Sequence, residues 1–166
     1  MTVASIVHTT LGSIALTAGA AVVLLPKGTM THRRVGRTYA IAMLALCVLA
    51  FTIRGSTPFF GGFGAFHIMA LVSLVTVGLG VRAVRMRSRS PDWRSTHLAW
   101  MLWSYVGLIM ATGSHVVRPV FLALREPLGN ATVAMTLTGL LLWGLPMAIG
   151  ASRIPRTARQ AEALGA

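Results

Sequence analysis

The side chains of this sequence best suited to chemistry are its histidines, because they lie within or at the ends of long apolar stretches. They are His8, His32, His67, His97 and His115. An ionisable residue inside a membrane is costly, and its default interpretation is functional. The acidic residues, Asp92, Glu126 and Glu162, all lie outside the apolar stretches. The histidines are therefore the candidate ligands.

By expected depth, the histidines form two groups. His8, His67 and His115 are expected a turn or two inside one boundary of the apolar stretches, and His32 and His97 at the other. From His67 to the far end of its stretch is ~15 residues, or ~22 Å at 1.5 Å per residue. Pairs of imidazoles from facing helices can ligate haem iron axially, with one haem near each surface. This layout predicts haem b sites that pair His8 with His67 and His32 with His97; His115 is a spare, or replaces His8.

Other ligands suit the same residues. The imidazoles of His8, His67 and His115 together suit zinc or copper. Basic residues near the two boundaries are candidates for contacts with haem propionates or lipid head groups. These are Arg54, Arg118, Lys27 and Arg33. A neutral histidine near an interface can equally be satisfied by a backbone carbonyl or a lipid phosphate, so the absence of any cofactor is an equal alternative.

Long charge-free stretches must position these residues. Hydrophobic residues make up 55% of the 166 residues and charged residues only 11%, against about a quarter in soluble domains. A helix needs about 20 apolar residues to cross a bilayer. We expect an all-α integral membrane protein, a five-transmembrane-helix bundle in a single domain over residues 1–152, and a short basic tail at 153–166. The expected spans lie near residues 3–25, 37–54, 62–82, 96–117 and 130–151, with prolines at the junctions, at Pro26, Pro58, Pro91, Pro119 and Pro127.

The basic residues predict an orientation. With five crossings, twelve of the fifteen fall on one side: Lys27, Arg33, Arg34, Arg37, Arg82, Arg85, Arg87, Arg89, Arg94, Arg153, Arg156 and Arg159. The positive-inside rule then places the N-terminus outside and the C-terminus in the cytoplasm, in a bacterial cytoplasmic (inner) membrane. The same rule explains the net charge of +12 without a nucleic-acid partner.

Part of the sequence repeats weakly. Tyr39 follows His32 of the Thr31-His32 pair by seven residues, and Tyr105 follows His97 of the Thr96-His97 pair by eight. Such an echo is typical of duplicated helical hairpins. The first four helices are then two copies of one hairpin with a fifth helix added; chance similarity is the alternative.

Two motifs carry a family resemblance. They are Lys27-Gly28 with His32-Arg33-Arg34-Val35-Gly36-Arg37-Thr38-Tyr39, and His97 with Trp100-Met101 and Ser104-Tyr105. Over roughly residues 5 to 118, the chain resembles the small bacterial membrane proteins of domain-of-unknown-function family 2306. Trp103 stands where members often carry an arginine beside the Ser-Tyr pair. The resemblance implies a multi-pass membrane protein and brings no established activity.

The sequence contains no hydrolase or transferase motif and no candidate catalytic residue, so any enzyme activity is at most that of a membrane redox protein. The specific hypothesis is transmembrane electron transfer by haem b. The first alternative is an accessory or assembly subunit that packs against other membrane proteins or against itself, for which small residues such as Ala15 and Gly19 suit close helix contacts. A small-molecule transporter is the second. Because His97 and His115 are 18 residues apart, they share one helix face; we expect His115 to point inward with His67 or His8 as its neighbour.

Overall fold

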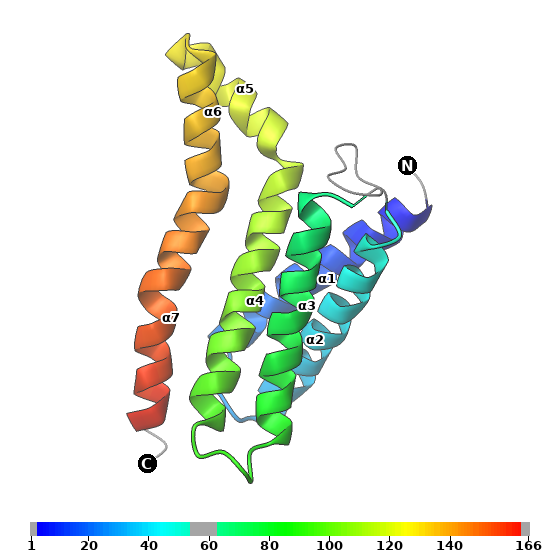
Figure 1. The fold of residues 1–166 in the computed structure, drawn as a ribbon, viewed down its shortest axis with the longest axis vertical. Helices are drawn as coiled ribbons and strands as arrows, with labels where there is room; N and C mark the ends of the chain where they lie inside the picture. Colours follow the sequence, from blue (N-terminus) through cyan, green and yellow to red (C-terminus); the bar gives the residue numbers. More distant parts are fainter. Residues whose placement is uncertain (1–2, 54–62, 164–166) are drawn as a thin grey trace.

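The computed structural model describes residues 3–53 and 63–163, and in this part of the chain the regular elements are all helical. They are α1 (Val3–Leu24), α2 (Met30–Ala50), α3 (Ala65–Arg85), α4 (Trp93–His115), α5 (Val117–Leu128), α6 (Ala131–Gly139), a π-helical segment η1 (Leu140–Gly144) and α7 (Leu145–Ala163). Figure 1 shows α2, α3 and α4 side by side, with α1 crossing behind them. The all-helical class expected from the sequence is confirmed.

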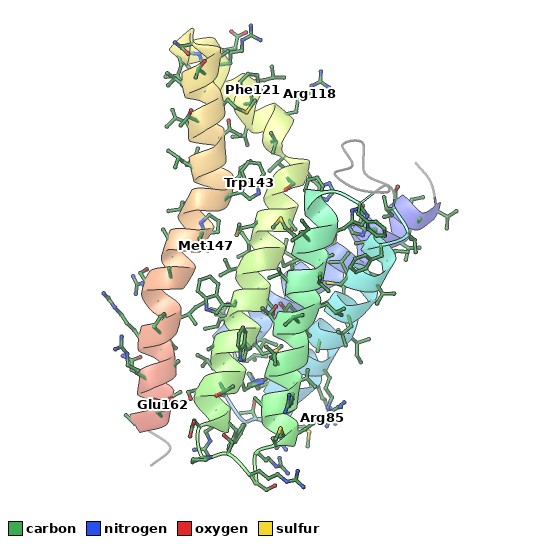
Figure 2. All side chains as sticks on the ribbon, viewed as in Figure 1. Arg85, Arg118, Phe121, Trp143, Met147 and Glu162 are labelled. Atoms are coloured by element: carbon green, nitrogen blue, oxygen red, sulfur yellow. The ribbon has the colours of Figure 1, made fainter. Side chains whose placement is uncertain are left out.

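The helices run between two distinct ends (Figure 1). One end holds the turn at 25–29, the loop at 86–92 and the end of α7; we call it the basic end, because the twelve basic residues grouped above lie there or in the adjoining turns. The opposite end holds the start of α1 and the α5–α6 connection. Arg118 and Arg85, labelled in Figure 2, lie at the opposite end and the basic end respectively.

The core is shared by the first four helices and depends most on α2. Its buried side chains are Ala15, Tyr39, Ala40, Ala42, Met43, Leu46, Cys47, Ala70, Val77 and Leu108. Side chains of α3 on the outer side, such as Phe66, Ile68 and Val72, are more than half exposed. An apolar exterior of this kind is suited to lipid rather than water.

The number of membrane spans differs from the expected five. Among the described helices, three are long and apolar enough to cross a membrane, over Val3–Leu24, Phe66–Arg85 and Ala131–Ala163. A fourth is formed if α4 and α5, which meet at 64°, count as one broken span. α2 is not among them, because three arginines fall in its first eight residues. The count of five is therefore not established.

The helix boundaries also depart from the expected ones. α2 begins at Met30 rather than near residue 37, because Thr29 caps it by accepting a hydrogen bond from the N–H of His32. Residues 117–128 form α5 where we expected a connection broken by Pro119 and Pro127. The basic tail is helical as far as Ala163, in continuation of the last expected span. Pro58 lies outside the described residues.

α7 and η1 pack along α4 through small residues. A β-carbon on Gly150 would lie 3.1 Å from Val106 and 3.2 Å from Trp103, and one on Gly113 would lie 3.2 Å from the Leu142 carbonyl oxygen. Neither glycine leaves room for a larger side chain. These two contacts fix the long last helix against the helix that carries His97 and His115.

Candidate functional site

Two histidines meet at the opposite end of the molecule. The ring centroids of His8, in α1, and His115, the last residue of α4, are 6.4 Å apart and the rings are tilted by 55°. The Nδ1 atom of His8 is buried and has no hydrogen-bond partner. Two imidazoles that ligate one metal ion have centroids roughly 6.3 Å apart, from a bond of about 2.0–2.1 Å and about 1.1 Å to each ring centre. The spacing of His8 and His115 fits such a pair.

The expectation for His115 holds only in part. Its neighbour is His8, as one of the two expected arrangements has it. The residue itself is exposed rather than directed into the bundle. The cause is the 64° bend after Val116, which carries α5 away and leaves no further turn to cover the ring.

His67 is occupied by the backbone and does not join His8. Its Nδ1 accepts a hydrogen bond from the N–H of Gly64 at 3.0 Å, so Nε2 carries the proton and donates to the carbonyl of Ile53 at 3.1 Å. The side chain is 6% exposed. With both ring nitrogens used, the neutral imidazole has no lone pair left for a metal. His67 thus caps the start of α3 and holds the carbonyl of Ile53, which follows α2.

The trio of His8, His67 and His115 is accordingly not assembled. Across residues 3–53 and 63–163, no group of three or more His, Cys, Asp or Glu side chains is placed to hold a metal ion. The trio was predicted from the similar depth of the three histidines in the membrane. In the structure, the His67 ring is instead directed to backbone atoms of Gly64 and Ile53. What remains at this end is a pair.

A second pair of histidines lies at the basic end. His32, in the first turn of α2, interacts electrostatically with His97 in α4, and its Nδ1 is buried without a hydrogen-bond partner. His97 donates from Nδ1 to the carbonyl of Gly80 at 2.8 Å. Ligating histidines usually donate their other N–H to a carbonyl or carboxylate in this way, which fixes the tautomer and leaves Nε2 free to bind. His97 therefore has the tautomer of a ligand.

Lys27 binds the end of α1 rather than offering a free ammonium group. Its Nζ donates to the carbonyls of Val22, Val23 and Leu25 at 2.8, 2.7 and 3.2 Å, and so satisfies the end of α1. Partial burial lowers the pKa of the ammonium. The ring of His32 also faces the Val22 carbonyl. Both residues proposed for propionate contacts at this end, Lys27 and Arg33, are exposed, but the Lys27 ammonium is held by backbone oxygens.

The two hairpins are alike at the basic end and unlike at the other. His32 faces a carbonyl near the end of α1, and His97 bonds one near the end of α3, so each second helix begins against the first in the same way. His8 and His67 occupy different environments, one beside His115 and one bonded to backbone. The internal repeat is therefore matched in structure only where the two helices of each hairpin connect.

Hydroxyl groups tie the helices between the two pairs. Tyr39 and Ser104 share a buried hydrogen bond of 2.7 Å, and Tyr105 donates to the Leu16 carbonyl at 3.2 Å. The Tyr39 and Tyr105 rings meet edge to face. The sequence presents these residues only as motif and repeat positions, and their spacing of seven or eight residues from a histidine is the signal that could have identified them.

The comparisons with known proteins place the chain in a family. The family model described as "Predicted membrane protein (DUF2306)" matches residues 5–151. The chain belongs to this family. The match extends past residue 118, where the expected resemblance ended, and covers α6, η1 and the first turns of α7 in this DUF2306 protein. Neither the curated proteins nor the solved structures yield a match.

The motifs that carry the family resemblance lie at the basic end and in the middle of the bundle. Lys27 donates to the carbonyls at the end of α1, His97 donates to the Gly80 carbonyl of α3, and Tyr39 shares a hydrogen bond with Ser104. Of the two arginines proposed at the opposite end, Arg54 lies outside the described residues and Arg118 is exposed on α5, pointing away from the helices in Figure 2.

Proposed function

We propose that this DUF2306 protein binds haem b and carries electrons across the membrane, with His8 and His115 as one pair of axial ligands and His32 and His97 as the other. The observation that carries the proposal is the 6.4 Å separation of the His8 and His115 rings. Haem bound by such pairs exchanges one electron at a time between ferric and ferrous iron. The histidines would supply the ligands, and the hydrogen bond from His97 to the Gly80 carbonyl fixes the tautomer and orientation of that ring.

The two pairs share α4, which supports a relay. His97 and His115 are 18 residues apart on this helix, about 27 Å at 1.5 Å per residue. His115 lies beside His8 of α1, and the proposed partner of His97 is His32 of α2, so each proposed pair would join two different helices. An electron accepted at one end would be passed on at the other.

Two-histidine sites favour haem over zinc or copper here. Structural and catalytic zinc sites take three or four protein ligands, whereas axial haem ligation takes two. In the described part of the chain, no third His, Cys, Asp or Glu completes either pair. Haem also suits an apolar bundle, because its macrocycle is itself largely apolar.

The absorption spectrum of the purified protein tests the proposal. We expect a Soret band and sharp α-bands on reduction, with one haem per histidine pair. His115→Ala and His97→Ala should each halve the haem content. A colourless protein that takes up no haemin on reconstitution would overturn the proposal and favour an accessory subunit packed against other membrane proteins.

We also infer that the basic end faces the cytoplasm, on the strength of the twelve-to-three distribution of basic residues. Ser88→Cys, in the exposed 86–92 loop, should react with a membrane-impermeant maleimide only from the cytoplasmic side. Thr132→Cys, exposed at the start of α6, is the matched control and should react only from outside. Both variants are made in a Cys47→Ala background. Labelling of Ser88→Cys from outside would show that the protein has the opposite orientation.

A further inference from the structure

A pocket lies between α3 and α4 where the two helices reach the basic end. Its volume is about 210 Å³. Leu79, Arg82 and Ala83 line it from α3, and Trp93 and Trp100 from α4. Close to this pocket the two helices are in tight contact, because a β-carbon on Gly80 of α3 would lie 2.6 Å from the sulfur of Met101 of α4. We call this space the Arg82 pocket.

The Arg82 pocket is apolar along its length and basic at its mouth. Leu79, Ala83 and Trp100 contribute apolar lining, and the polar lining residues include Ser90, in the 86–92 loop, and Arg82, in the last turn of α3. Arg82 donates from Nε to the thioether sulfur of Met86 at 3.2 Å, a weak acceptor that leaves the other guanidinium donors for an anion. The ligand of such a pocket should be apolar along most of its length and anionic at one end.

The charge around the mouth is unbalanced. Residues 79–100 carry Arg82, Arg85, Arg87, Arg89 and Arg94 against one carboxylate, Asp92. Arg94 stacks over Trp93 at 5.4 Å from the ring centroid, which holds a second guanidinium beside the pocket. Tryptophan is enriched at the level of lipid head groups, where this end of α3 and α4 lies in a membrane.

We propose that the Arg82 pocket binds an anionic phospholipid, with the phosphate at Arg82 and Ser90 and part of one acyl chain along Leu79, Ala83 and Trp100. A basic pocket between spanning helices is the arrangement that recognises anionic head groups. The pocket is too small for a whole lipid, so the rest of the molecule stays in the bilayer. This site is independent of the histidine pairs and of the proposed electron transfer.

Quenching of tryptophan fluorescence measures this binding directly. The probes are phosphatidylglycerol and phosphatidylcholine with identical dibrominated acyl chains, titrated into the protein in vesicles of unbrominated phosphatidylcholine. We expect stronger quenching by phosphatidylglycerol, lost when Trp93 and Trp100 are both changed to Phe. Arg82→Gln should reduce the preference for phosphatidylglycerol by about fivefold or more.

The matched control is Arg159→Gln, since Arg159 is exposed on α7 at the same end and does not line the pocket. It should retain the preference. Equal quenching by the two lipids, or equal losses in Arg82→Gln and Arg159→Gln, would overturn the proposal in favour of general surface attraction. Full competition by millimolar inorganic phosphate would also overturn it, because the site would then bind a free anion.

Discussion

Tyr39 and Ser104, separated by 65 residues in the sequence, share a buried hydrogen bond of 2.7 Å that joins α2 to α4. Ser104 donates its own proton to the Met101 carbonyl at 2.7 Å, so Tyr39 is the donor in the bond between them. Both side chains are at most 2% exposed. α2 begins with several polar and basic residues. The hydrogen bond of Tyr39, in its buried middle, connects this helix to the rest of the bundle.

Tyr39→Phe removes this donor and leaves the Ser104 hydroxyl bonded within its own helix. We expect a loss of about 0.5–2 kcal/mol in the free energy of unfolding, the range of hydrogen bonds between membrane helices. Denaturation in mixed micelles measures the loss, and a double-mutant cycle with Ser104→Ala isolates the pair. Thr38→Ala is the neighbouring control, since Thr38 bonds only its own helix. Strictly additive losses would show that the bond does not couple α2 to α4.

Gly19 is the point of closest approach between α1 and the two tyrosines. A β-carbon there would lie 2.5 Å from the Tyr105 ring and 3.0 Å from the Tyr39 ring. Gly19→Ala should therefore destabilise the protein by about 1–3 kcal/mol, the usual cost of overpacking. Gly78→Ala, which would meet nothing within 4 Å, should be neutral or slightly stabilising in the same assay. Equal stability of the two variants would contradict this packing.

The sequence predicted the helical class but not every helix. Hydropathy identifies stretches long enough to span a membrane, and α5 has only twelve residues. Pro119 suggested a break, yet it occupies the first turn of α5, where a missing N–H costs little. α2 starts seven residues early because arginine is a good helix former, although it disfavours the membrane. Helix formation and membrane insertion are separate properties. The hydropathy pattern predicts which segments enter the membrane, not where each helix begins and ends.

The candidate site was predictable in depth but not in direction. The two levels of histidines followed from counting residues, and the structure brings the rings of His8 and His115 together. The ring of His67 turns instead to Gly64 and Ile53. Both partners are backbone atoms of residues outside the regular helices, and helical periodicity does not predict contacts with such residues.

In the haem-free protein, His32 at the basic end should make stability depend on pH. Burial lowers the pKa of His32, and the nearby charges of Lys27 and His97 lower it further, while the Val22 carbonyl acts in the opposite direction. Below about pH 6.5 the unfolded chain takes up a proton that the folded chain resists. The free energy of unfolding should therefore fall as the pH is lowered from about 6.5 towards 5 and be independent of this group above that range. His32→Gln should flatten the slope and Thr31→Ser should keep it; an unchanged slope in His32→Gln would assign the pH dependence elsewhere.

His67 and His115 should respond in opposite ways to the same substitution. His67→Ala removes the acceptor that caps α3 and leaves the Ile53 carbonyl without its donor, so unfolding should become easier by about 1–2 kcal/mol. The haem content of the folded fraction should stay unchanged, because neither ring nitrogen of His67 is free to ligate. His115→Ala, at an exposed helix end, should change stability little and abolish the spectrum of one haem. Thermal denaturation and reduced-minus-oxidised spectra of both variants separate the two roles. Loss of haem in the folded His67→Ala protein would return His67 to the ligand set, and an unchanged spectrum in His115→Ala would remove His115 from it.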